Sequence, residues 1–245
     1  MSARVTLATT ARVLGQLRRD RRTLALVFLV APALVTLFKF IFQYQSLAFE
    51  RIGAPLIGLF PLVMMFLITS IAMLRERTTG TLERLMSLPL AKLDLLVGYA
   101  LAFALLAAAQ GAITGTIGFA VLGIKTLGPA WAVVLLAIAN ALLGMALGLF
   151  FSAFARTEFQ AVQFMPAVLL PQILLSGLLL PRGAMPRALQ IVADALPVTY
   201  AYDALARATH PRPLGGRVAL DVAVILGATL IALTLGALTL RRRTA

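Results

Sequence analysis

The sequence predicts an all-α integral membrane protein with six transmembrane helices. Of its 245 residues, 61% are hydrophobic and only 13% are charged, whereas a soluble domain carries about 25% charged residues. The apolar residues form runs of about 20, long enough to cross a hydrocarbon core of about 30 Å. The arginines flank these runs and do not gather on one soluble face, so the net charge of +13 indicates membrane topology and contact with lipid headgroups. We therefore expect membrane lipids, and no nucleic acid, among the partners.

The chain divides into two predicted domains. Residues 1–22 form an amphipathic helix along the inner leaflet, because Leu7, Ala11, Leu14 and Leu17 recur at helical spacing with arginines between them. A basic tail without structure is the alternative. Residues 23–245 form the six-span domain, with spans expected at 23–42, 54–74, 94–122, 129–151, 162–180 and 217–240.

Helix breakers and small residues mark features within the spans. The outer third of the second span carries Pro55 and Pro61 and should be bent or loosely wound. Gly111 and Gly115 allow two helices to approach closely in the third span, an explanation we favour over a ligand site. In the fourth span, Asn140 should donate a hydrogen bond across a helix contact, since a buried unpaired amide is costly.

Both termini and the loop after the second span are expected on the cytoplasmic side. Fourteen of the 22 basic residues fall in segments that this topology places inside. The loop between the fifth and sixth spans is more basic than the rule predicts. Within it, residues 186–197 form a short amphipathic pattern, and Tyr200 and Tyr202 suit a membrane interface. A plain surface loop is the alternative here.

The polar segment 75–89 separates the second and third spans. It carries three arginines, two glutamates and a break at Gly80 and Thr81, and Pro89 ends it. Leu82, Leu85 and Met86 share one face of a short helix. The segment is either an ordinary cytoplasmic loop or a docking point for a soluble partner.

The amino-acid sequence of this segment resembles the corresponding segment in permeases of the type-2 ABC exporter family. The matching residues are Glu76-Arg77, Gly80-Thr81-Leu82-Glu83, Leu85 and Pro89. The resemblance implies a coupling helix, seated in a cleft of an ATP-binding subunit. The residues that would serve this coupling are Glu76, Arg77, Gly80, Thr81, Leu82, Glu83, Arg84, Leu85 and Met86.

The resemblance also implies how the remainder of the chain is used. Spans two and five would face each other across the transport pathway, and re-entrant or interfacial helices between spans five and six would cap its outer end. Gln163, Phe164 and Gln172 are the residues we expect to line the pathway, because polar and aromatic groups on a proline-containing span suit an amphiphilic cargo.

Several other functions are excluded by the residues present. Gly123-Ile124-Lys125-Thr126 lacks the adjacent glycine and lysine of a phosphate-binding loop. ATP and Mg²⁺ are therefore expected on a separate ATPase chain, with no cofactor here. One histidine and no cysteine leave neither a metalloprotease motif nor a thiol site, so we expect no metal and no catalysis. The spans lack the mid-depth charges that ion-coupled carriers use.

The sequence thus predicts the permease subunit of an ATP-driven exporter in the cytoplasmic membrane. The cargo would be a hydrophobic or amphiphilic drug, antibiotic or lipid, and the partners would be two ATP-binding subunits and a second permease, identical or related. A non-transporting membrane scaffold or assembly factor, and a subunit of a lipid-linked glycan exporter, remain the alternatives.

Overall fold

A computed structural model describes residues 2–44, 46–81, 92–209 and 215–239, and these contain helices and no strand. Six helices are long and apolar enough to cross a membrane, as predicted, so the chain is a multi-pass membrane protein. The elements in order are α1 (Ala3–Arg19), α2 (Arg21–Ile41), α3 (Ser46–Thr78), α5 (Lys92–Thr116), the π-helix η1 (Ile117–Val121), α6 (Ala130–Phe151), α7 (Glu158–Leu175), η2 (Arg182–Ala184), α8 (Arg187–Asp194), α9 (Pro197–Ala208) and α10 (Gly216–Leu238).

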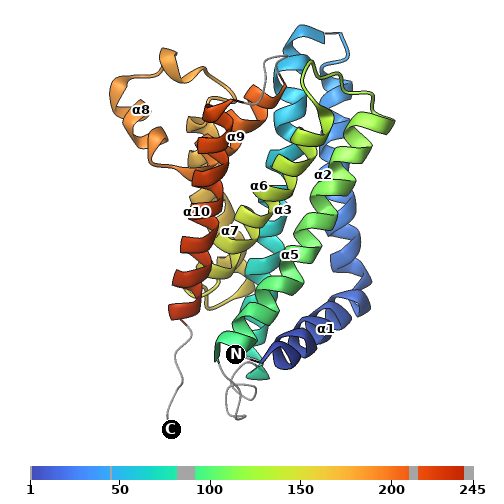
Figure 1. Cartoon of the computed structure of the whole chain (residues 1–245), viewed down its shortest axis with the longest axis vertical. Helices are drawn as coiled ribbons and strands as arrows, with labels where there is room; N and C mark the ends of the chain where they lie inside the picture. Colours follow the sequence, from blue (N-terminus) through green and yellow to red (C-terminus); the bar gives the residue numbers. More distant parts are fainter. Residues whose placement is uncertain (1, 45, 82–91, 210–214, 240–245) are drawn as a thin grey trace.

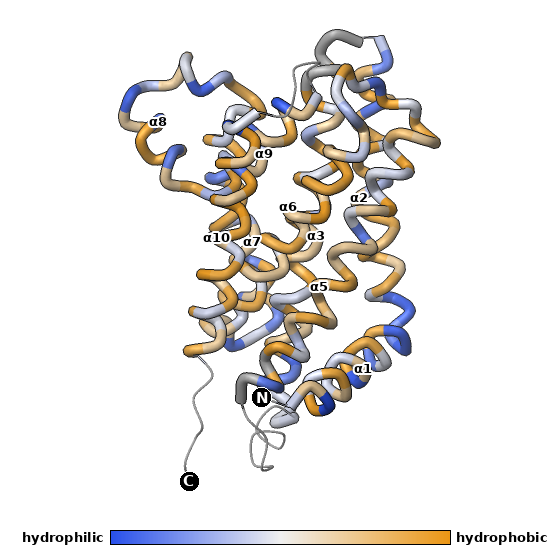
Figure 2. Tube along the Cα trace, viewed as in Figure 1, coloured by the Kyte–Doolittle hydropathy of each residue, from blue (hydrophilic) through white to orange (hydrophobic). Residues whose placement is uncertain are grey.

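The six long helices run along one axis, and shorter helices lie at the two ends (Figure 1). Helix α1 crosses one end, where α3 finishes and α5 begins, and we call this the α1 end. Helices α8 and α9 lie at the opposite end, which we call the α8 end. Hydrophilic positions gather mainly at these two ends (Figure 2). The first described residues and the last turn of α10 lie at the α1 end (Figure 1).

Helices α3 and α6 form the closest pair in the bundle. A Cβ atom on Gly144 would overlap the backbone carbonyl of Leu62, and one on Gly148 would overlap the carbonyl of Phe66. The two backbones therefore touch where the glycines lie, and the surrounding side chains make the main core. These two glycines therefore pack span four against span two.

The predicted small-residue contact of span three is confirmed. A Cβ atom on Gly111 would lie 2.9 Å from the backbone nitrogen of Ile138 in α6. Asn140 is fully buried, and its amide nitrogen lies 3.5 Å from the carbonyl oxygen of Ala201 in α9. The amide thus makes the predicted interhelical hydrogen bond, although at the long end of the range.

Helix α3 is longer than the predicted second span at both ends. It begins at Ser46, inside the expected external loop, and continues beyond Leu74 to Thr78. It passes through Pro55 and Pro61 without a break, so the expectation of loose winding is wrong. Helix α7 lies closer to the N-terminus than the predicted fifth span. It starts at Glu158, where the Thr157 hydroxyl accepts a hydrogen bond from the Gln160 amide, and it ends at Leu175.

Helix α1 lies where the amphipathic helix is predicted, and the face that packs against the bundle overlaps the apolar stripe only in part. The buried residues are Thr6, Thr9, Thr10, Val13 and Leu17. Leu7 of the apolar stripe is 63% exposed. The Thr10 hydroxyl donates to the Gly98 carbonyl of α5 at 3.1 Å, and a Cβ atom on Gly98 would lie 2.6 Å from Thr9. Small threonines opposite a glycine therefore bring α1 onto α5.

Candidate functional site

Three consecutive charged residues end helix α3 at the α1 end. Arg75, Glu76 and Arg77 lie in its last turn. Successive residues of an α-helix point about 100° apart, so their side chains reach three different neighbours. We call these three residues the α3 hub.

Glu76 connects α3 to α1 and α5. Its carboxylate accepts a hydrogen bond of 2.7 Å from the Tyr99 hydroxyl and lies 3.8 Å from the Arg12 guanidinium. Arg12 also donates to the Tyr99 hydroxyl, and its guanidinium carbon lies 5.4 Å from the centre of the tyrosine ring. The Glu76 side chain is only 15% exposed, so water competes weakly for these contacts.

Arg75 connects α3 to the start of α7. Its guanidinium donates two hydrogen bonds to the Glu158 carboxylate, at 2.6 Å from Nε and 3.1 Å from Nη2. Both side chains are about half exposed, so the pair fixes geometry more than it adds stability.

Arg77 points toward α10. Its Nη2 lies 3.4 Å from the Thr239 hydroxyl, and its buried Nε has no hydrogen-bond partner in the described part of the chain. No carboxylate from the described residues pairs with it. Sequence reasoning assigned Arg77 to the coupling segment, whereas in the structure its side chain lies between helices.

Gly80 ends α3 and turns the chain away. Its φ of 71° is a left-handed conformation that glycine adopts without cost, which confirms the predicted break. Before it, the hydroxyls of Thr78 and Thr79 donate to carbonyls of the preceding turn. Thr81 is the last described residue of this segment. Residues 82–91 lie outside the described part, so the coupling helix with Leu82, Glu83, Arg84, Leu85 and Met86 stays a prediction.

A cavity of about 690 Å³ lies beside the hub, between α1, α2, α3 and α5. Apolar side chains form most of its wall, and Gln16, Asp20, Arg75 and Glu76 add polar groups. Asp20 caps α2: it accepts hydrogen bonds from the Thr23 hydroxyl at 2.6 Å and the Thr23 amide at 3.1 Å. These bonds lower the pKa of Asp20 below its ordinary value.

The three predicted pathway residues do not form one cluster. Gln163 is exposed on the outer face of α7. Phe164 is half-buried, with its ring 5.9 Å from that of Phe151. Gln172 is buried and donates to the Val168 carbonyl of its own helix at 3.1 Å.

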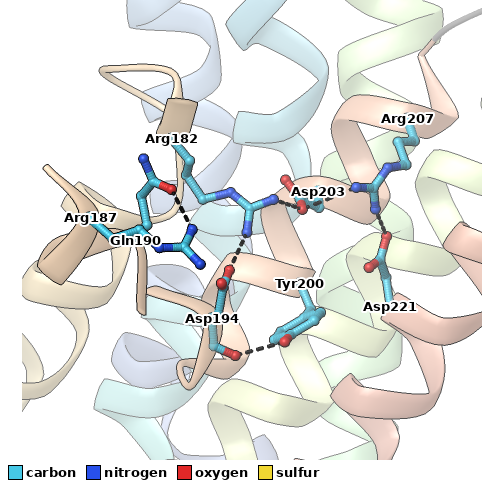
Figure 3. A network of polar contacts seen from close by, with 8 residues as sticks. All are labelled: Arg182, Arg187, Gln190, Asp194, Tyr200, Asp203, Arg207 and Asp221. Atoms are coloured by element: carbon cyan, nitrogen blue, oxygen red, sulfur yellow. Dashed lines mark hydrogen bonds and ion pairs between the residues drawn. The ribbon is translucent and has the colours of Figure 1, made fainter. Parts of the chain in front are cut away.

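A network of ion pairs at the α8 end was not foreseen from the sequence (Figure 3). Arg182 pairs with Asp194 at 3.1 Å and with Asp203, while Arg207 pairs with Asp203 at 3.3 Å and with Asp221. The network ties η2, α8, α9 and α10 together. It also pairs two arginines of the loop between the fifth and sixth spans, Arg182 and Arg207, with carboxylates.

Burial affects the acidic groups of this network. It raises the pKa of Asp203 above its ordinary value, and the charges of Arg182 and Arg207 oppose the rise. Among the described residues, no group of three or more His, Cys, Asp or Glu side chains is placed to hold a metal ion.

One comparison with known proteins identifies a relationship. The model of the family described as ABC-2 type transporter matches residues 4–208, from the second residue of α1 to the end of α9. The match therefore includes the hub and the α8-end network except for Asp221 of α10. No curated protein matches the sequence.

Proposed function

We propose that this chain, which belongs to the ABC-2 type transporter family, is the permease subunit of an exporter driven by separate ATP-binding subunits. Members of this family are membrane components of transporters. The six apolar helices of the chain make it a multi-pass membrane protein. Two ATP-binding subunits, carrying ATP and Mg²⁺, and a second permease, identical or related, would complete the transporter. The α1 end would face the cytoplasm of a cell whose cytoplasmic membrane holds the complex.

The α3 hub is the observation that best supports this proposal. The segment that would dock on the ATPase leaves α3 immediately after Gly80. In the turn before it, Glu76 holds α1 and α5 through contacts of 2.7 Å and 3.8 Å, and Arg75 holds α7 through a two-bond ion pair. A displacement of the docked segment would therefore move four helices together.

The exposed face of α7 supports a pathway shared with a second permease. Gln163 lies on this face together with apolar neighbours such as Phe159 and Leu170. An amide facing lipid tails would lack hydrogen-bond partners, which is costly. A position toward a water-containing pathway between two permeases satisfies that amide. Phe164 and Gln172 would then support the wall from behind.

The cargo we propose is a hydrophobic or amphiphilic molecule, such as a drug, an antibiotic or a lipid, moved outward. The spans carry few charged groups with which to bind a polar solute. A lipid-linked glycan is a second cargo of the same amphiphilic kind.

Glu83→Lys tests the proposal in proteoliposomes that contain the permease and its ATPase. We expect transport, and the stimulation of ATP hydrolysis by substrate, to be lost while membrane insertion is unchanged, because reversing this charge disturbs docking in the ATPase cleft. Arg187→Glu is the matched control. It reverses an exposed charge at the α8 end, where Arg187 contacts only Gln190 among the described residues, so we expect it to transport normally.

Two results would contradict the proposal. Unaltered substrate-stimulated ATP hydrolysis in Glu83→Lys would remove the role of the segment 82–88. A purified chain that binds no ATP-hydrolysing subunit would favour the scaffold interpretation.

A further inference from the structure

A groove of about 440 Å³ lies between α5 and α10 at the α1 end. Both helices pack on α6 and scarcely touch each other, so α6 forms the floor. The wall is almost entirely apolar and includes Val97, Leu101, Ala104, Met145 and Leu233. We call it the α5–α10 groove. Its volume lies within the range of about 300–1,000 Å³ that small-molecule sites occupy.

Within the part of the chain that the structure describes, Arg77 is the one cation of this wall. Its Nη2 reaches the Thr239 hydroxyl at 3.4 Å, and its buried Nε has no partner among residues 2–44, 46–81, 92–209 and 215–239. Arg75 and Arg12, by contrast, both face carboxylates. A guanidinium surrounded by hydrocarbon is costly unless an anion pairs with it. The missing group is therefore an anion with two or more oxygens, because the guanidinium binds such groups with parallel hydrogen bonds.

The position of the groove restricts the source of this anion. Arg77 lies in the last turn of α3, at the boundary of the apolar zone, and the groove extends from there along α10 from Ala237 to Thr229. Eight residues of helix correspond to about 12 Å. Along the rim, Leu101 is 42% exposed and Leu230 is 66% exposed, so the groove opens sideways toward the space that lipid tails fill.

We propose that the α5–α10 groove binds an anionic phospholipid from the surrounding bilayer. Its phosphate would pair with the Arg77 guanidinium, and an acyl chain would lie along Leu101, Ala104 and Leu233. Basic side chains between transmembrane helices bind anionic headgroups in this way. The site requires only that the chain spans a membrane, so it does not depend on coupling to an ATPase or on the nature of the cargo.

Native mass spectrometry of the whole chain tests the site. The chain is released from nanodiscs that contain equal amounts of phosphatidylglycerol, which is anionic, and phosphatidylcholine, which has no net charge. We expect a retained adduct of one lipid, with phosphatidylglycerol favoured at least tenfold. Arg77→Gln should remove this preference. Ala104→Phe, which fills the groove and leaves Arg77 in place, should reduce the retention of both lipids.

Arg18→Gln is the control for charge alone. Arg18 is an exposed arginine of α1 at the same end of the bundle, and its loss should leave the preference for phosphatidylglycerol unchanged. An equal loss in Arg18→Gln and Arg77→Gln would overturn the proposal, because the attraction would then be general. So would full retention of phosphatidylglycerol in Arg77→Gln or in Ala104→Phe. Should Arg77→Gln fail to fold, Ala104→Phe decides the question.

Discussion

Replacing Glu76 by alanine should release α1 from the bundle. The substitution removes the 2.7 Å hydrogen bond from Tyr99 and the 3.8 Å ion pair with Arg12. A hydrogen bond to a charged group contributes about 1.5–3 kcal/mol, and a partly exposed ion pair adds at most about 1 kcal/mol. Because Tyr99 lies on α5, only the ion pair with Arg12 reaches α1, so we expect α1 to be held less firmly by up to about 1 kcal/mol, a factor of up to about 5 in the opening equilibrium.

Hydrogen–deuterium exchange of the α1 amides measures this release. The amides of Glu76→Ala should exchange faster by that factor, while those of α6 keep their protection. Glu158→Ala is the matched control: it also removes one carboxylate from an ion pair of the hub, but that pair is about half exposed and does not involve α1. Unchanged α1 exchange in Glu76→Ala would refute the role we give to Glu76.

Three further substitutions test the packing and the capping of the helices. Gly144→Ala should destabilise the chain by about 1–3 kcal/mol or more, because the new methyl group would overlap the Leu62 carbonyl. Gly227 has open space around it, so Gly227→Ala should raise the stability by up to about 1 kcal/mol. Thermal unfolding measures both variants. Asp20→Ala should cost about 0.5–2 kcal/mol through loss of the α2 cap. Hydrogen bonds lower the pKa of Asp20 in the fold. Its contribution to stability should therefore be present above the ordinary pKa of 3.8 and vanish as pH falls through the lowered pKa. A plot of the free energy of unfolding against pH should accordingly be flatter over this range in Asp20→Ala.

Hydropathy alone predicted the number of spans, because burial in lipid requires long apolar helices whatever their neighbours. It misplaced the end of α3. Arg75 and Glu76 look like loop residues by composition, but their charges are paired with side chains of other helices. Such partners come from distant parts of the chain and leave no local pattern.

The face of α1 that packs on the bundle was not predicted from the sequence. In a soluble protein an apolar stripe such as Leu7 and Leu14 marks the packed side, but beside a membrane lipid also accepts it. The packed side is set by Thr9 and Thr10 opposite Gly98, where small size matters more than hydropathy.

The α8-end network was out of reach from the sequence. Arg182, Asp203 and Asp221 lie on three separate elements, and no spacing rule connects them. Gln163 and Gln172 were selected by composition alone, and the structure places one on the surface of α7 and the other inside.

The length of α3 has a mechanical consequence. Its 33 residues span about 50 Å, some 20 Å more than the hydrocarbon core. Leu62, the residue that meets Gly144 backbone to backbone, stands at the middle of this length. The closest contact of α3 with α6 thus lies at the midpoint of the helix. A tilt of about 5° about Leu62 moves the two ends of α3 by about 2 Å in opposite directions. A force applied beside Gly80 would therefore displace the Ser46 end of α3 in the opposite direction.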